Sequence, residues 1–422
     1  MAGLAGMVTG ETYLFDAVRT PCGRGRVDGT LRGVKPVSLV AGLVDDLRKR
    51  NPTLDVDRLS DLVLGVATPV GDQGGDLARA AALVAGLPQT VGGTVVSRLG
   101  ASGLEAVASA AARVRAGWDD LLLAGGVESM SRVPAGADGG PLAADPATNY
   151  QTGFVPAGVA ADLLATLASL TRADLDAYAL RSRRLAAAAW ADGRLARSVV
   201  PVHDHGLLVL DHDERVGPVG SGTPVEQARL DAAAGHLAKL TAAFAQAGEQ
   251  LGFDTVALRS HHWLERIDHV HTAGSAAGPA DGAALVVVGG ERTGEQLGLT
   301  PRARIVAVAS AGVAPTLALG GATAATRLLL ARAGLDVADV DLFETAEAYA
   351  AVALAYQRDL AIPDEKLNVN GGAVAIGHPL GATGAMLVAT VVDELHRRGA
   401  RRALVSAAAG AGMGIAMLLE RV

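Results

Sequence analysis

One histidine in a glycine-rich stretch is the side chain best placed for chemistry in this sequence. Residues 368–385 read NVNGGAVAIGHPLGATGA and place His378 between Gly377 and Pro379. Glycines let a backbone turn tightly and approach a ligand closely, and a proline fixes the direction of the chain. The pattern therefore predicts a loop that holds the imidazole in place and then opens a helix. The alternative is an ordinary turn with a packed histidine.

Other side chains are weaker candidates. Cys22 is the only cysteine, which excludes an internal disulfide framework and a cysteine-based metal cluster. Ser102 lies at an expected helix start, where a capping or structural role is favoured over nucleophilicity. His269 and His271 have ligand-like spacing, but no cysteine or carboxylate pattern adjoins them, so we expect no metal site. The basic run 181–184 is interpreted as a solvated helix face, with contact to phosphates as the alternative.

Length, charge and hydropathy exclude several classes of protein. The 422 residues suggest two or three domains. Half of the residues are hydrophobic, yet no uncharged apolar run reaches the roughly 18 residues of a membrane span. The net charge of -7 argues against nucleic-acid binding. The first residues lack the basic region of a secretory signal, so we expect a cytoplasmic protein.

Two short motifs recur in the same order at one spacing. Leu54-Asp-Val returns as Leu335-Asp-Val, and Gly100-Ala-Ser-Gly returns as Gly381-Ala-Thr-Gly, each 281 residues later. A helical pattern precedes each first motif, and a helix and a buried strand follow each second motif. The repeat predicts two similar halves built from βαβ units in an α/β layered architecture. The two helix starts are then related by a pseudo-dyad.

The hydrophobic pattern predicts the elements of both halves. Strands are expected at 13–18, 62–67, 119–126 and 403–407, and helices at 37–50, 100–116, 172–192 and 322–333. Between about 128 and 254 the pattern changes, which indicates an insertion that helps to bind ligand; an insertion that only packs or oligomerises is the alternative. We therefore expect a first half from 1–127 plus 255–298, an inserted loop domain at 128–254, and a second half at 299–422.

These features resemble the thiolases, the acyl-CoA C-acyltransferases, from Tyr13 to Val422. The shared stretches are DAVRTP from Asp16, AGGVESMS from Ala124, the His378 loop and GMGIA from Gly412. The resemblance implies the thiolase fold, with two duplicated βαβαβαββ halves in five α-β-α-β-α layers and an inserted loop domain. It also implies acetyl-CoA acetyltransferase or 3-ketoacyl-CoA thiolase activity on coenzyme A and acyl-CoA, without a permanently bound cofactor, in a homo-oligomer (dimer or tetramer).

The resemblance also assigns the site, and several of its polar groups are missing. Gly100 stands where the family has its nucleophilic cysteine, and Ala408 where it has the acid/base cysteine. Ala346 replaces the asparagine of an oxyanion hole. His378 is the retained group that polarises a thioester oxygen. The remaining implied positions are a backbone-donor turn and the coenzyme-binding residues, namely Gly410, Ser275, Ala277 and Gly377, with Ala277 at the position of a pantetheine-contacting serine.

Three functional hypotheses follow. The protein binds acyl-CoA without catalysis, alone or as the partner of an active thiolase; or it carries out noncovalent chemistry at His378; or it is a structural subunit with a vestigial pocket. Ordinary two-step thiolysis or Claisen condensation is not expected without the cysteines. Glu347, next to Ala346, is a further candidate base, and Ser406 is expected to be satisfied within a buried strand.

Overall fold

A mixed ten-stranded sheet forms the centre of the protein. The computed structural model describes residues 10–216 and 232–422. The strand order is β10-β11-β12-β9-β1-β8-β5-β3-β4, and β2 pairs with β8. The strands are β1 (Thr12–Arg19), β2 (Gly23–Arg24), β3 (Asp61–Gly65), β4 (Gly92–Val96), β5 (Leu121–Ser129), β8 (Ala280–Gly290), β9 (Ala303–Gly312), β10 (Leu342–Thr345), β11 (Arg402–Ala409) and β12 (Met413–Arg421).

The two halves repeat one topology, as the sequence motifs predict. In the first half β3 and β5 are parallel, and β5–β8 and β8–β1 are antiparallel. In the second half β10 and β11 are parallel, and β11–β12 and β12–β9 are antiparallel. The matching helices are α1 (Pro36–Arg50), α2 (Leu77–Val84) and α3 (Ser102–Arg115) in the first half, and α11 (Gly321–Ala333), α12 (Ala350–Leu360) and α14 (Leu380–Arg398) in the second. The short β1–β9 pairing joins the halves.

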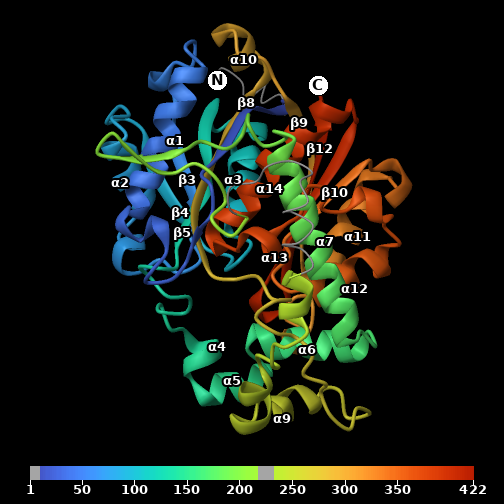
Figure 1. The fold of residues 1–422 in the computed structure, drawn as a ribbon. Coiled ribbons are helices and arrows are strands. Elements are labelled where there is room, and N and C mark those ends of the chain that lie inside the picture. Colours follow the sequence, from blue (N-terminus) through green and yellow to red (C-terminus); the bar gives the residue numbers. More distant parts are fainter. Residues whose placement is uncertain (1–9, 217–231) are drawn as a thin grey trace.

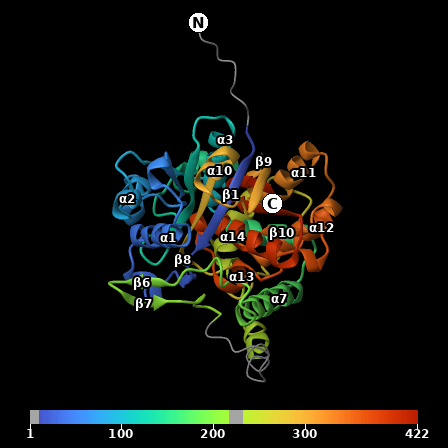
Figure 2. The same cartoon turned by 90° about the horizontal axis from the view of Figure 1, so that it is seen from above.

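Residues along each strand alternate between a central core and an outer core. The strands of the first half therefore form one β layer and those of the second half another, with α3 and α14 between them and the remaining paired helices outside, which gives five layers. Leu62 and Leu64 pack in the outer core with α1 and α2, whereas Val63 packs in the central core with α3 and α14. In the second half Phe343 belongs to the other outer core and Leu342 to the central one. Figure 2 shows α1 and α2 on one side, α11 and α12 on the other, and α14 between them. Strands buried on both faces explain the continuous apolar runs in the sequence.

Glycines let the two central helices approach each other at their starts. A Cβ added to Gly103 would lie 2.5 Å from the carbonyl oxygen of Gly381, and one added to Gly384 would overlap the backbone of Leu104. Both repeated motifs therefore supply a glycine to the same contact. This is the contact expected if a pseudo-dyad relates the two helix starts.

The segment between β5 and β8 leaves the layers. Its described helices include α4 (Pro141–Ala144), α5 (Pro146–Thr152), α6 (Ala157–Leu167), α7 (Arg172–Ala191) and α9 (Phe253–Leu258), with a hairpin of β6 (Val202–Asp204) and β7 (Leu207–Leu210). In Figure 1, α4, α5, α6 and α9 form a lobe below the layers, while α7 runs beside α12 and α13 (Ala373–Ile376). A short helix, α10 (Glu291–Leu297), follows β8. The expected boundaries of the inserted domain stay a prediction.

The expected strands and helices agree with the structure to within three residues at each end. Within the described part of the chain, no single helix is long and apolar enough to cross a membrane; one pair of helical segments, 146–167 and 172–191, passes only in combination and is bent by 114°.

Candidate active site

The loop before α14 holds His378 by its backbone. The amide nitrogen of His378 donates to the carbonyl oxygen of Gly278 at 3.0 Å. The preceding Gly377 has a φ of 104°, a conformation that side chains rarely adopt. A Cβ at Gly377 would also lie 2.8 Å from the Cβ of Ala280. Both the backbone angle and the lack of space for a Cβ therefore require glycine beside the histidine, as the sequence predicts.

The imidazole of His378 is anchored at one nitrogen and open at the other. Its Nδ1 lies 2.6 Å from Oγ1 of Thr383, which also lies 3.2 Å from the carbonyl oxygen of Pro379. The hydroxyl has one proton: donation to Nδ1 leaves Nε2–H as a donor, and donation to Pro379 leaves Nε2 as an acceptor. Burial lowers the pKa of His378 to about 4, so the ring is neutral at neutral pH.

Gly100 faces the open nitrogen. A Cβ built on Gly100 would lie 3.4 Å from Nε2 of His378 and 3.7 Å from the carbonyl oxygen of Ala408. Gly100 is not among the described glycines with positive φ. The backbone thus accepts a side chain at this position, just ahead of α3, and the glycine is not needed for the turn. The structure brings three of the predicted positions together.

Two strained turns meet beside Gly100. Leu99 adopts a left-handed conformation with φ 49°, and Ala411 does so with φ 60°. The hydroxyl of Ser102 donates to the carbonyl oxygen of Leu99 at 2.6 Å, so its role is structural, as the sequence indicates. A Cβ at Gly410 would lie 3.0 Å from Cδ1 of Leu99. Left-handed non-glycine residues cost about 1 to 3 kcal/mol each and cluster at functional sites.

The segment 275–279 lies beside His378 and carries the expected coenzyme-binding positions. The amide of Ala277 donates to the carbonyl oxygen of Ala348, and the carbonyl oxygen of Ser275 accepts from the amide of Ala350, both at 2.9 Å. The hydroxyl of Ser275 is buried and accepts from the amide of Thr272 at 3.0 Å. It closes its own turn, so this segment offers mainly backbone and methyl groups to a ligand.

Ala346 lies at the end of β10 next to the strand that carries Ala408. Its side chain is buried, and its amide donates to the carbonyl oxygen of Ser406 at 3.0 Å. The hydroxyl of Ser406 bonds to Oγ1 of Thr345 at 2.9 Å, which confirms that this serine is satisfied within the sheet. No side-chain hydrogen-bonding group is present at positions 346 and 408, because both residues are alanine.

Glu347 belongs to a buried hydrogen-bond network. Its Oε1 accepts from the hydroxyl of Tyr178 at 2.7 Å and from Nδ2 of Asn368 at 2.8 Å. Its Oε2 accepts from the hydroxyl of Ser182 at 2.7 Å and from the amide of Val374 at 3.2 Å. These four donors fix α7 against the histidine loop. The network favours a structural role for Glu347 over that of a base.

The basic run on α7 is not a solvated face, so that interpretation is wrong. Arg181 donates to the carbonyl oxygen of Leu367 at 2.9 Å, and Arg183 donates to that of Gly274 at 2.8 Å. Within the run only Arg184 is exposed. The reason is that α7 packs against both α12 and α13, which a one-sided apolar pattern does not reveal.

Carboxylates from distant segments reach His269 and His271. Nδ1 of His269 lies 2.8 Å from Oδ2 of Asp162, and its Nε2 lies 3.0 Å from Oδ2 of Asp254. Nδ1 of His271 lies 2.7 Å from Oδ1 of Asp162. Burial opposes protonation of His269, but the hydrogen bonds outweigh it and raise its pKa. In the described ranges no cluster of three or more such side chains has metal-binding geometry. The pair connects α6 and α9 to the segment that leads into the site.

Cys22 is enclosed in the central core. Its side chain has no exposed surface, and its amide donates to Oδ1 of Asp213 at 2.8 Å. Burial, followed by the charge of Asp213, raises the pKa of the thiol. A protonated, inaccessible thiol is a poor nucleophile.

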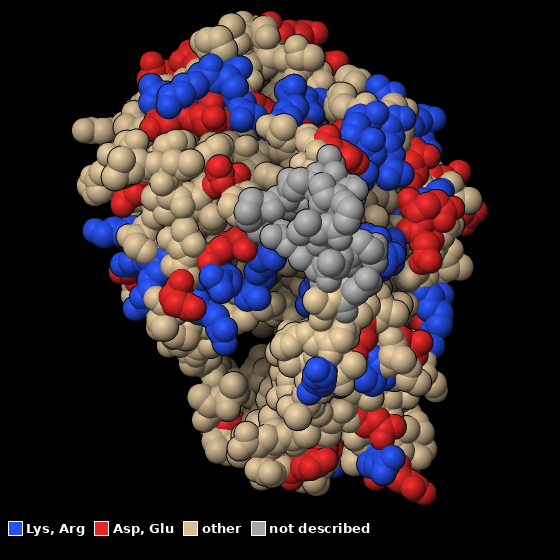
Figure 3. Space-filling view, viewed as in Figure 1, with Lys and Arg blue, Asp and Glu red and all other residues tan. Residues whose placement is uncertain are grey.

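A basic hollow adjoins the backbone that holds His378. It has a volume of about 380 Å³ and lies beside Gly278, with Arg24, Arg183 and Arg215 in its wall. Among the described residues that line it, Glu214 is the one carboxylate. Burial and the neighbouring Arg215 lower the pKa of Arg183. Figure 3 shows basic side chains above a hollow between the layers and the lobe. Such a site favours an anionic group.

Comparisons with known proteins match this architecture along the chain. The family described as "Thiolase, N-terminal domain" matches residues 12–251, and the one described as "Thiolase, C-terminal domain" matches residues 299–421. The chain belongs to the thiolase family. Members of this family of acyl-CoA acyltransferases use CoA thioesters as substrates, so the resemblance seen in the sequence is confirmed.

Individual thiolases are similar over nearly the full length. The beta-ketoadipyl-CoA thiolase of Escherichia coli is 40% identical, covering 98% of this chain and 100% of the relative. A 3-ketoacyl-CoA thiolase of Shewanella frigidimarina is 35% identical with the same coverage. The crystal structure of the Bacillus anthracis acetyl-CoA acetyltransferase aligns with a TM-score of 0.81 and 31% identity over 99% of this chain and 100% of that one. The predicted thiolase fold is thereby confirmed.

Three residues of the candidate site were not expected from the sequence. Thr383, the anchor of His378, lies five residues after it at the helix start, and that spacing was a usable signal. Glu128 is buried and accepts from the amides of Ala67 and Gly381, both at 2.8 Å, so it ties the start of α14 to the first half. Arg215, beside Gly278, lies in a segment without a recognisable pattern.

Proposed function

We propose that the protein binds CoA thioesters at the His378 site and does not transfer the acyl group through a covalent intermediate. The observation that carries the proposal is the position of Gly100, whose missing side chain would point at Nε2 of His378. Gly100 offers no nucleophile, and Cys22 is buried with a raised thiol pKa. The proposed site therefore keeps a polarising group and lacks the acyl-carrying sulfur.

In this proposal His378 and the backbone of the Gly410 turn bind the thioester and polarise its carbonyl group. With Nδ1 accepting from Thr383, Nε2–H of His378 donates to the thioester oxygen, and backbone amides of the Gly410 turn give a second donor region. Ala408 leaves no side chain to move a proton at the α-carbon. Loss of a covalent nucleophile costs on the order of 10⁶ in rate, or about 8 kcal/mol of barrier. We therefore expect binding without measurable thiolysis or condensation.

We further propose a thioester whose acyl chain ends in a carboxylate. Two similar proteins are named for such substrates, a beta-ketoadipyl-CoA thiolase and a 3-oxoadipyl-CoA/3-oxo-5,6-dehydrosuberyl-CoA thiolase. The basic hollow beside Gly278 supports this choice, because Nη1 of Arg183 is buried there without a hydrogen-bond partner in the described chain. The phosphates of coenzyme A carry the same kind of charge, and the experiment below separates the two sources.

We propose a homo-oligomer in the cytoplasm, or pairing with an active thiolase. Thiolase-family members are typically homo-oligomers. Strand β4 ends the sheet, and all five of its residues are half-buried. The adjacent helix α2 exposes Leu83 and Val84. A strand edge that no described strand pairs with, next to exposed apolar side chains, is suited to a partner subunit. The runner-up is a noncatalytic partner or structural subunit that binds no thioester, and it is favoured by the loss of polar groups at positions 346 and 408.

Calorimetric titration of the full-length protein with succinyl-CoA, acetyl-CoA and CoA tests the proposal, with product analysis of the same samples. We expect succinyl-CoA to bind best, without product. Arg183→Gln should weaken binding of succinyl-CoA alone if the hollow binds the acyl carboxylate, and of all three ligands if it binds coenzyme phosphates. Arg184→Gln, an exposed neighbour on α7, is the matched control. If none of the three ligands binds the wild-type protein, thioester binding is refuted and the structural-subunit hypothesis is favoured.

A further inference from the structure

A second basic groove lies at the opposite end of α14 from His378. It has a volume of about 900 Å³ and is lined by the ends of α1, α7 and α14 and by the link between the two halves, residues 298–302. Asp393, in its wall, is thirteen residues beyond Leu380 at the start of α14. At 1.5 Å per helical residue, the groove is roughly 20 Å from the histidine loop. It is therefore separate from the proposed thioester site.

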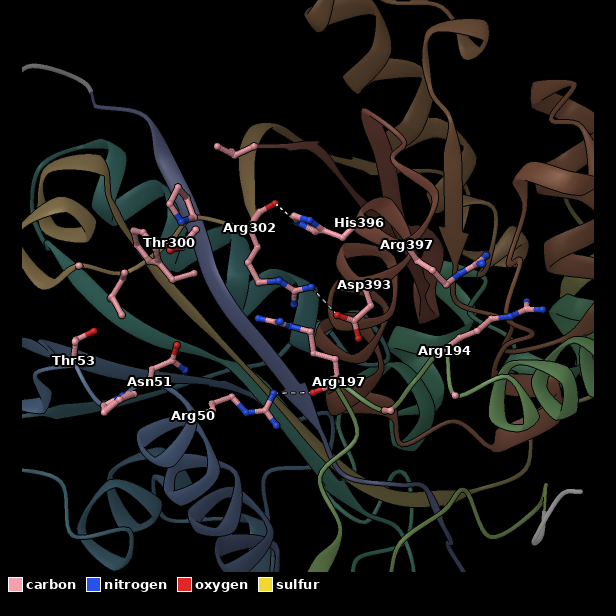
Figure 4. A pocket seen from close by; sticks show the side chains of 18 of the residues that line it. Arg50, Asn51, Thr53, Arg194, Arg197, Thr300, Arg302, Asp393, His396 and Arg397 are labelled. Atoms are coloured by element: carbon pink, nitrogen blue, oxygen red, sulfur yellow. Dashed lines mark hydrogen bonds and ion pairs between the residues drawn. The ribbon is translucent and has the colours of Figure 1, made fainter. Parts of the chain in front are cut away.

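Arginines converge on this groove. The lining includes Arg50, Arg194, Arg197, Arg302 and Arg397. Figure 4 shows the guanidinium groups of Arg50, Arg197 and Arg302 pointing into the same part of the groove. Two aspartates, at positions 192 and 393, are the acidic residues of the described lining. Four of these arginines already face carboxylates: Arg50 faces Asp46, Arg194 faces Asp192, Arg302 faces Asp393 and Arg397 faces Glu394. In the described part of the chain Arg197 has no ion-pair partner, so its charge remains available to an anionic ligand.

The floor of the groove has buried polar atoms without partners. Arg302 is only 6% exposed, and its Nη2 donates to Oδ1 of Asp393 at 2.8 Å. Among the described residues, Nη1 of Arg302, Nε of Arg50 and Oδ2 of Asp393 are buried and lack a hydrogen-bond partner. The nearby carboxylate of Asp16 is 3.9 Å from each arginine. Buried polar atoms without a partner cost about 1 to 3 kcal/mol each. Because these atoms are covered, they act on the groove through their charge and not through direct contact.

The groove is connected to the loop that carries His378. Nη1 of Arg194 donates to Oδ1 of Asn370 at 3.2 Å, and Nδ2 of Asn370 donates to Oε2 of Glu394 at 3.1 Å. Glu394 in turn accepts from Nε of Arg397 at 2.9 Å. Asn370 precedes Gly371 in the histidine loop. An anion that draws on Arg194 or Arg397 therefore changes the contacts that hold this loop.

We propose that the groove is an effector site for a small organic oxyanion of nucleotide size, with a phosphate or carboxylate bound by Arg50, Arg197 and Arg302. The exposed guanidinium group of Arg197 meets the oxyanion, and the groups of Arg50 and Arg302 add positive charge beneath it. The volume falls in the range of small-molecule sites. Occupancy changes thioester binding through Asn370, so this second claim depends on the proposed function, whereas binding in the groove does not.

Titration of the full-length protein with AMP, inorganic phosphate and citrate, with adenosine as the uncharged control, tests binding in the groove. AMP or citrate should bind saturably, and binding should be at least fivefold weaker in Arg197→Gln, an exposed position that avoids the buried Arg302. Arg183→Gln is the control for the other basic hollow. The proposal is overturned if no probe binds, if Arg197→Gln binds as wild type does, or if Arg183→Gln abolishes the binding instead.

A second measurement tests whether a ligand in the groove changes the affinity for the thioester. The affinity for succinyl-CoA is determined with and without the saturating groove probe, in wild type and in Arg197→Gln. A change of at least threefold in wild type and none in the variant is expected. An unchanged affinity in wild type would overturn the effector role, while a wild type that binds AMP but no thioester would refute the proposed function and leave the groove as an anion site.

Discussion

Replacing Gly100 by cysteine should create a reactive thiol beside His378 and restore only a small part of thiolase turnover. The Cβ position is 3.4 Å from Nε2 and 3.7 Å from the carbonyl oxygen of Ala408, so a side chain fits with small adjustments of its neighbours. The sulfur would lie at the N-terminal end of α3, where the helix dipole lowers a thiol pKa. The variant should therefore fold and be alkylated readily by iodoacetamide.

The expected rate of the Gly100→Cys variant is limited by the catalytic groups that are still missing at positions 408 and 346. A cysteine at position 100 restores the nucleophile, which is worth on the order of 10⁶ in rate, but Ala408 still offers no acid/base group. General acid–base catalysis contributes typically 10²- to 10⁴-fold. The single variant Gly100→Cys should therefore remain roughly 10²-fold or more below the double variant Gly100→Cys/Ala408→Cys. The missing polar group at Ala346 keeps even the double variant below an intact thiolase.

The assay follows acetoacetyl-CoA consumption in the presence of CoA, with alkylation read by mass spectrometry. Gly100→Ser is the size-matched control, and wild-type protein should stay unmodified because its one thiol, Cys22, is buried. Turnover by Gly100→Cys equal to that of the double variant would show that a second cysteine at position 408 is not needed for acid–base catalysis. An unreactive cysteine at position 100 would contradict the placement of its sulfur at the N-terminal end of α3, facing Nε2 of His378.

Three further predictions concern single side chains. Glu347→Ala should lower the unfolding free energy by roughly 3 to 5 kcal/mol in urea denaturation, because buried donors lose their acceptor, whereas the exposed Glu365→Ala should change it little. His269→Gln should lower the melting temperature more at pH 6 than at pH 9: the raised pKa means that the charged ring stabilises the fold below about pH 6.5 and that this stabilisation is lost as pH rises through the folded pKa. Equal shifts at both pH values would argue against that ion pair. His378→Ala should weaken binding of acetyl-CoA more than of CoA, since only the thioester oxygen meets Nε2, and equal losses in calorimetry would exclude this contact.

The fold was predictable because its signals are local and repeated. The expected helix at 172–192 is observed as Arg172–Ala191, and the expected strand at 13–18 as Thr12–Arg19. Strands covered on both faces give apolar runs, and glycines mark close approaches such as Gly103 against Gly381. The duplicated motifs then determine which elements correspond.

The contacts of the site were less predictable because they join distant segments. Asp162 reaches His269 across 107 residues, and no sequence pattern links the two. The burial of Arg183 comes from helices on two sides of α7, which periodicity along α7 alone does not encode. The resemblance assigned His378 and Gly100 to one site, whereas their distance, the anchor Thr383 and the neighbouring Arg215 emerged from the packing.

Mass spectrometry of wild-type protein incubated with acetoacetyl-CoA shows whether an acyl group becomes covalently attached to the chain. Under native conditions we expect a complex heavier by one intact CoA thioester. Under denaturing conditions the same sample should show the unmodified chain, because Gly100 supplies no sulfur to carry an acyl group. An acetyl adduct that survives denaturation and disappears on addition of CoA would contradict noncovalent binding, because it would show that another side chain of the protein carries the acyl group.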